Sequence, residues 1–185
     1  HRGRVTGCHA IRGQIGFGME GGAEGVLWQN NHTYSPTLHG FRFASGYGSV
    51  IAFNRVLGAG TGNAFLLDRQ KDITIHGNIT KNTERGVAYA GFDTGSSNDG
   101  DAQSKNLTIT SNQIETASGG SCITDAYHGG STRNCHDVMI QGNILKSTGY
   151  SIQLLWSRKV NIQGNSGSEG AAIRLTRDVS GIVGN

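Results

Sequence analysis

The sequence predicts an all-β chain wound as a single-stranded parallel β-helix, a solenoid in which each coil stacks on the previous one. Two observations predict this fold. A short apolar motif that ends in asparagine recurs along the chain, and a second apolar alternation follows each asparagine about ten residues later. The 30 glycines supply turns without a period of three, which excludes collagen, and the repeated Ile, Val and Leu runs argue against disorder.

The motif is clearest at 73–78, where Ile73 and Ile75 alternate with polar residues before Gly77 and Asn78. It returns at 107–112, 138–143 and 160–165, and in weaker form at 26–31, 49–54 and 182–185. The asparagines that mark the repeats are Asn31, Asn54, Asn78, Asn112, Asn143, Asn165 and Asn185, separated by 23, 24, 34, 31, 22 and 20 residues. Cys8 lies 23 residues before Asn31 and takes the same place in a first, partial repeat.

Alternation of apolar and polar residues in short runs broken by Gly, Asn and Ser is typical of strands joined by tight turns. A repeat of about 22 residues is too short for a propeller blade, which needs about 40. A leucine-rich repeat matches Leu107 to Ile114, but its second half requires helical character, and here that half is another alternating run among glycines. A parallel β-helix fits better, and about seven coils spaced by about 4.8 Å would form a rod about 35 Å long.

The asparagines are expected to be scaffold residues rather than ligand-binding residues. Asparagine tolerates the left-handed backbone of a bend, and stacked asparagines can bond their amides from coil to coil. The glycine before the asparagine, as at Gly77, Gly142 and Gly164, permits a positive φ.

The Asn-marked coils resemble right-handed parallel β-helix proteins of the pectin-lyase-like class, most closely bacteriophage tailspike depolymerases. That class also includes polysaccharide lyases, polygalacturonase-like hydrolases and epimerases. The resemblance covers nearly the whole chain, but it concerns architecture. The polygalacturonase signatures Asn-Thr-Asp, Asp-Asp and Arg-Ile-Lys are absent from the sequence, so no catalytic residue of the family carries over.

Composition narrows the possible partners. The formal charge of +3 comes from scattered Lys and Arg, which argues against nucleic-acid binding, and no apolar run is long enough to enter a membrane. We expect residues 1–185 to form one β-helix domain that is an excerpt of a longer chain, because polar end caps are not evident. Cys8, Cys122 and Cys135 are expected to be free, partly buried thiols, although Cys122 and Cys135 flank one insertion and could staple it.

The two long spacings, 34 and 31 residues, predict loops at 92–105 and 126–136. Both insertions follow the second apolar run of their coil, so the loops should protrude side by side from a rigid scaffold. Solvated loops without a role are the alternative, and a binding role is slightly favoured over it.

Aligning the second runs predicts an inward column of side chains. It contains Phe43, Leu67, Tyr89, Thr124, Leu154 and Leu175. The next position then faces outward, which would place Asp68 and Asp125 on one face about 9.5 Å apart, with Asp93 within reach of Asp125. Two carboxyl groups at about 5 Å or about 6.5–9.5 Å are what glycoside hydrolysis needs. We therefore take Asp93, Asp125 and Asp68 as candidate catalytic residues, against the alternative that each is an exposed turn residue.

Candidate substrate-binding residues surround these aspartates: Tyr127, His128, Arg133, Trp156 and Arg158. Aromatic rings stack on sugars and Arg binds carboxylates, although Trp156 could equally turn into the core. The same residues permit a lyase, in which Tyr127 or His128 removes a proton and Arg158 neutralises a uronate. Calcium bound by Asp93, Asp99 and Asp101 is weakly indicated, so neither a metal nor a cofactor is predicted.

The sequence hypothesis is that the chain binds and cleaves bacterial surface polysaccharide as part of a phage tailspike-type depolymerase, by hydrolysis with paired carboxylates. The alternatives are a non-catalytic glycan-binding or structural spike or adhesin, and a secreted lyase or epimerase. A homotrimer and an extracellular or virion-surface location are implied by the resemblance alone.

Overall fold

The computed structural model describes residues 3–20, 23–59, 61–90, 104–125, 135–167, 172–176 and 181–184, and every regular element in these ranges is a strand. The strands are β1 (Arg4–Thr6), β2 (His9–Met19), β3 (Ala23–Glu24), β4 (Leu27–Gln29), β5 (His32–Tyr47), β6 (Val50–Ala52), β7 (Arg55–Leu57), β8 (Asn63–His76), β9 (Ile79–Ala90), β10 (Ser104–Thr110), β11 (Gln113–Thr124), β12 (Cys135–Gln141), β13 (Ile144–Lys146), β14 (Tyr150–Leu154), β15 (Ser157–Gln163), β16 (Ser166–Gly167), β17 (Ala172–Leu175) and β18 (Gly181–Gly184).

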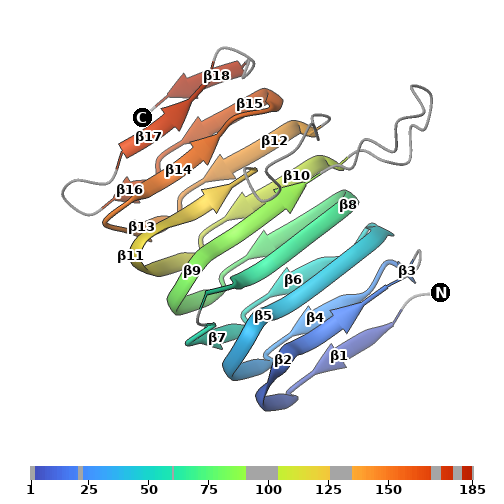
Figure 1. The fold of residues 1–185 in the computed structure, drawn as a ribbon. Helices are drawn as coiled ribbons and strands as arrows, with labels where there is room; N and C mark the ends of the chain where they lie inside the picture. Colours follow the sequence, from blue (N-terminus) through green and yellow to red (C-terminus); the bar gives the residue numbers. More distant parts are fainter. Residues whose placement is uncertain are drawn as a thin grey trace, which may run out of the picture.

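Each strand pairs in parallel with the equivalent strand of the next coil (Figure 1). One face runs β1–β4–β6–β8–β10–β12–β15–β18. A second runs β5–β7–β9–β11–β13–β16, and a third runs β2–β5–β8–β9–β11–β14–β17. Long strands such as β8 bend around a corner and belong to more than one face. The chain is therefore a parallel β-helix, as predicted, while its handedness and coil number stay predictions.

Residues in the left-handed region form the corners. One corner stacks Asp72, Asn106, Asp137 and Lys159, with φ between 51° and 57°. Gly77 has φ 63°, as its place before the asparagine predicted, and a Cβ there would come within 2.7 Å of the Phe53 ring. Asp, Asn and glycine tolerate this backbone most readily, which explains why they recur at the bends, and Lys159 is the exception in this corner.

The asparagine ladder is confirmed as scaffold. The backbone N–H of Asn54 donates to Asn78 Oδ1 at 2.8 Å, and the Asn54 side-chain Nδ2 donates to the same oxygen at 3.1 Å. The pattern repeats from Asn31 to Asn165. Each amide also donates to a carbonyl of the preceding coil, as Asn78 Nδ2 does to Ile51 at 2.9 Å. The Cys8 N–H donates to Asn31 Oδ1 at 3.0 Å, so Cys8 does begin the ladder.

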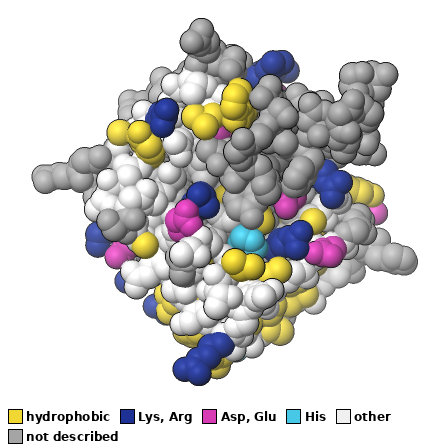
Figure 2. All heavy atoms as spheres, viewed as in Figure 1, with side chains coloured by type: hydrophobic (Ala, Val, Ile, Leu, Met, Phe, Trp, Pro, Cys, Tyr) yellow, Lys and Arg dark blue, Asp and Glu magenta, His cyan; other side chains and the backbone are white. Residues whose placement is uncertain are grey.

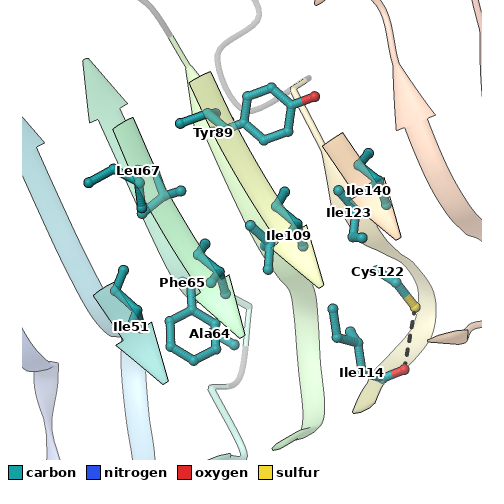
Figure 3. Packing of buried hydrophobic residues seen from close by; sticks show 14 of the residues in the cluster. Ile51, Ala64, Phe65, Leu67, Tyr89, Ile109, Ile114, Cys122, Ile123 and Ile140 are labelled. Carbon is teal, nitrogen blue, oxygen red and sulfur yellow. Dashed lines mark hydrogen bonds between the residues drawn. The ribbon is translucent and has the colours of Figure 1, made fainter. Parts of the chain in front are cut away.

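The interior is filled by apolar columns that run along the rod (Figure 3). The rings of Phe17, Phe41 and Phe65 stack with centroids 5.0 and 5.1 Å apart. Phe43, Leu67 and Tyr89 lie in the predicted inward column. Because like stacks on like at a fixed spacing, each coil buries its apolar side chains against the next.

The predicted inward column is wrong at Thr124, which pairs with Ala88 and Gln153 rather than lying level with Tyr89 and Leu154. Ile123 pairs with Val87 and Ile152 instead. At the N-terminal end Phe17 pairs with Phe41 and Ile15 pairs with His39. In both places the register shifts along the strand, between Thr116 and Ser121 and between Gly13 and Ile15, so counting residues from the asparagine fails there.

Cys8, Cys122 and Cys135 are free thiols, as predicted, but Cys8 is exposed whereas Cys122 and Cys135 are buried. Burial raises the pKa of the Cys122 thiol to about 12. In the described part of the chain, no helix has the length and apolar character needed to cross a membrane.

Candidate functional site

Several predicted site residues lie outside the described residues: Asp93, Tyr127, His128 and Arg133, together with Asp99 and Asp101. Their roles stay predictions. The two stretches that contain them leave neighbouring strands, β9 and β11, and return at Ser104 and Cys135, which are paired. The two interruptions therefore rejoin the rod at one corner in adjacent coils.

Asp68 is buried, with 4% of its surface exposed, although an exposed carboxylate was expected. Its register agrees with the prediction, because it pairs with Ala44 on one side and Ala90 on the other. Leu66, two residues earlier on the same strand, is only 2% exposed. This part of the outer face is thus covered, and Asp68 is shielded from bulk water.

Asp125 lies in a different place from the one predicted. Thr124 pairs with Ala88 and Gln153, which puts Asp125 level with Tyr89 and Leu154 rather than with Ala90 and Leu155. The cause is the register shift in β11 described above. Asp125 is also only 4% exposed, so the expectation that it faces solvent is wrong.

The Asp125 carboxylate binds the following coil. Oδ1 accepts the Leu155 N–H at 2.7 Å, and Oδ2 accepts the Trp156 N–H at 2.9 Å and the Ser157 hydroxyl at 2.7 Å. These partners lie on the side of Asp125 away from the coil of Asp68. Asp68 and Asp125 therefore do not form the pair on one face that the sequence suggested. Asp125 instead anchors the bend before β15 through its three hydrogen bonds.

A buried tyrosine extends this network. The Tyr89 hydroxyl lies 2.9 Å from Ser157 Oγ, and because the Ser157 proton goes to Asp125, Tyr89 donates to Ser157. Burial, followed by the nearby Asp125 charge, raises the pKa of Tyr89 well above its usual range. Burial also raises the pKa of Asp125, although its donors oppose the shift. Tyr89 is therefore a neutral hydrogen-bond donor at any moderate pH.

The remaining described candidates lie just beyond this anchor. Trp156 is partly buried, which is between the core position and the exposed position that the sequence allowed. Arg158 is exposed and belongs to an outward column with Lys71, Lys105 and His136. His136 Nδ1 lies 2.6 Å from Asp137 Oδ2, and this hydrogen bond, with help from Lys159, lowers the pKa of Asp137.

A polar row that sequence reasoning missed follows a corner of the third face. His39, Asn63, Arg85, Ser121 and Tyr150 are paired in consecutive coils. Ser121 donates to Gln153 Oε1 at 3.2 Å, and the Arg174 guanidinium lies 5.5 Å from the centre of the Tyr150 ring. The available signal was the repeat spacing, since His39 and Asn63 are 24 residues apart like two ladder asparagines. The five residues are of five different types, so a search of the sequence for repeated residue types does not find the row.

His39 lies close to two positive charges, those of Arg42 and Arg85. Burial, and then the charges of Arg42 and Arg85, lower its pKa, while a hydrogen bond to the Leu38 backbone opposes the shift. On the face shown in Figure 2, basic and acidic side chains lie next to each other. The described residues contain no group of three or more His, Cys, Asp or Glu side chains arranged to hold a metal ion.

No family model and no curated protein sequence matches the chain. Among solved structures, the chain is similar to the A-module of a mannuronan C-5 epimerase from Azotobacter vinelandii, with 17% sequence identity and a TM-score of 0.40. The likeness covers 100% of this chain and 56% of that one, so the chain spans little more than half of that structure. At this TM-score the likeness carries no argument, and the fold rests on the strand pairing described above.

Proposed function

We propose that this chain is the glycan-binding segment of a polysaccharide depolymerase of the phage tailspike type, acting on bacterial surface polysaccharide. The observation that carries the proposal is the polar row from His39 to Tyr150. It places a different hydrogen-bonding side chain in each of five consecutive coils along the axis of the rod, and of these Arg85 and Tyr150 are partly exposed.

A row of this kind suits an extended polymer better than a small molecule. The side chains repeat at about the 4.8 Å spacing of stacked strands, so neighbouring units of a linear ligand meet successive side chains. Tyr150 offers an aromatic ring, and Arg85 offers N–H donors for hydroxyl or carboxylate oxygens. The strands hold these groups in place before the ligand arrives, which lowers the entropy lost on binding.

Cleavage by carboxylates is the finer part of the proposal. Asp68 is on the outer side of β8, the strand that contributes Asn63 to the row, and it is shielded from water. We assign the role of general acid to Asp68. Asp93 and Asp125 remain candidates for the second carboxyl, and the anchoring bonds of Asp125 favour Asp93 of the two.

A binding segment without catalysis is the second candidate function. The observation that favours it is that the Asp125 carboxylate is buried and already accepts three hydrogen bonds. A protein of this kind would retain glycan and leave it intact. A secreted lyase or epimerase is a third possibility, distinguished by its product.

Incubation with capsular and O-antigen polysaccharides tests these alternatives. New reducing ends without absorbance of an unsaturated sugar support hydrolysis, both signals together indicate a lyase, and retention without either indicates a binding module. Asp68→Asn and Asp93→Asn should each abolish cleavage without weakening retention. Asp72→Asn, at an exposed corner of β8, is the matched control and should cleave normally. Normal cleavage by the Asp68 and Asp93 variants would show that these two residues are not the catalytic carboxylates.

The assembly and location also belong to this proposal. Parallel β-helices present strand edges that invite association, and tailspike-like rods are trimers, so a homotrimer on a virion or in the extracellular space is proposed. Light scattering of the purified protein tests the trimer, and a monomer at micromolar concentration would contradict it.

A further inference from the structure

The polar row begins with a buried histidine and a buried amide, and one atom of the amide has no hydrogen-bond partner. His39 is 8% exposed and Asn63 is fully buried, and Asn63 Nδ2 lies 3.3 Å from His39 Nδ1. The other amide atom, Asn63 Oδ1, is buried without a hydrogen bond. Buried amide oxygens nearly always have a donor. The pair is therefore poised for a second state in which Oδ1 gains one.

The charges of two arginines act on this pair. Arg42, three residues after His39 on β5, is 3.1 Å from a Glu20 carboxylate oxygen. Arg85, which pairs with Asn63 in the next coil, is 2.7 Å from Glu84. A guanidinium has five N–H donors, so one contact with a carboxylate leaves donors for a ligand. Both charges act on the imidazole, since both lower the pKa of His39.

Close backbone contacts fix the position of these side chains. The Gly62 carbonyl accepts the N–H groups of Glu84 and Arg85 at 3.1 and 3.2 Å. A Cβ at Gly62 would lie 1.3 Å from the Leu38 carbonyl oxygen, and a Cβ at Gly40 would lie 2.7 Å from the carbonyl oxygen of Ala64. Only glycine permits the coils to approach this closely. The backbones of His39 and Arg85 are thus held at one distance, which makes a preorganised site.

We propose that His39, Arg42 and Arg85 form a binding site for the anionic group of an acidic sugar residue. That the anion is carried by a sugar rests on the proposed function; that the site binds an anion rests on the charges and on the unmatched amide. An anion between the guanidinium groups offsets their repulsion of a protonated imidazole. A half turn of the Asn63 amide then places Oδ1 against Nδ1–H of the protonated ring. Anion binding and proton uptake by His39 are therefore coupled.

The charged groups around His39 set the direction of the coupling. Arg42 and Arg85 oppose its protonation, and the Leu38 hydrogen bond favours it. Glu20 and Glu84 each contact one terminal nitrogen of these arginines. Anion affinity should consequently rise as the pH falls through the histidine range, which is the reverse of what a site that required a neutral imidazole would show.

Imidazole nitrogen signals in ¹⁵N-labelled protein test the site, with glucuronate, glucose and acetate as probes. Glucuronate should produce a saturable shift at His39 and raise its pKa, whereas glucose should produce neither. A response to acetate equal to that of glucuronate would mean general anion binding and would overturn the acidic-sugar assignment. No response to glucuronate would overturn the site itself.

Variants separate the site from general charge effects. Arg85→Gln and Arg42→Gln should each lower glucuronate affinity about tenfold, the value of one charge-assisted hydrogen bond. Arg55→Gln, an exposed arginine on β7, is the matched control and should bind like the parent. Equal affinity in all three variants would overturn the site. Retention of polysaccharide without a His39 response would overturn this inference while leaving the proposed function standing.

Discussion

The asparagine ladder and the His39 row are both columns of polar side chains along the same rod, but they satisfy their hydrogen bonds in different ways. In the ladder, one residue type repeats and each amide finds identical partners in the neighbouring coils. In the row, every coil contributes a different residue, and one buried oxygen, Asn63 Oδ1, has no partner. The repeated asparagines stabilise the scaffold, whereas the unlike residues of the His39 row leave hydrogen-bond donors and acceptors for a ligand.

Breaking the ladder should have the largest effect. Asn112→Ala removes the acceptor of both the N–H and the Nδ2 of Asn78, and it also removes the donor to the Ile75 carbonyl. Buried groups left without partners cost about 1–3 kcal/mol each, so we expect a loss of about 3–5 kcal/mol in the free energy of unfolding, measured with denaturant. Gln141→Ala, at an exposed position on β12, is the control and should change stability by less than about 0.5 kcal/mol.

Crowding the corner of the row should come next. In Gly62→Ala the new methyl group meets the Leu38 backbone, which cannot turn aside as a side chain can. We expect a loss of about 3 kcal/mol, near the upper end for overpacking. Gly142→Ala introduces the same methyl group at φ 61°, where the nearest atom is Ser111 Oγ at 4.0 Å, and should lose only about 1 kcal/mol for the backbone conformation. Equal losses in the two variants would show that the close approach at Gly62 is not a constraint.

The anchor at Asp125 should follow. Ser157→Ala removes one donor to the carboxylate and leaves the Tyr89 hydroxyl without its acceptor, so we expect a loss of about 1–3 kcal/mol at neutral pH. Ser151→Ala, at another buried serine in the preceding strand β14, is the matched control and should lose less, because no Ser151 hydrogen bond is disrupted. Unfolding midpoints of both variants provide the measurement.

The pH dependence of stability should give the smallest effect. Because burial holds the folded-state pKa of Asp125 above its unfolded value, the folded protein binds the proton more tightly. The Asp125 contribution to stability is therefore greatest below the unfolded pKa and falls as the pH rises through the folded pKa. The Ser157 hydroxyl lowers the pKa of Asp125, so Ser157→Ala should raise that pKa and extend the loss of stability to higher pH. A slope unchanged from that of the parent protein would contradict the role of Ser157.

The fold was predictable because the same sequence motif recurs once in each coil. Asn78, Gly77 and the alternating isoleucines specify one coil, and their copies specify the stack. The candidate site was less accessible, since a register shift in β11 moved Asp125 by one residue and turned an expected surface acid into an anchor. The row was missed because His39, Asn63 and Arg85 are different residue types. They become neighbours only through the pairing of their strands. Local irregularity and stacking between unlike residues are the properties that a linear repeat does not reveal.

Polysaccharide retention by Arg85→Gln, compared with Arg55→Gln, tests the central claim most directly. We predict that the parent protein and Arg55→Gln are retained on immobilised acidic bacterial polysaccharide, and that Arg85→Gln is eluted early while its unfolding midpoint is unchanged. Equal retention of the two variants, or loss of retention by Arg55→Gln alone, would contradict binding along the His39 row.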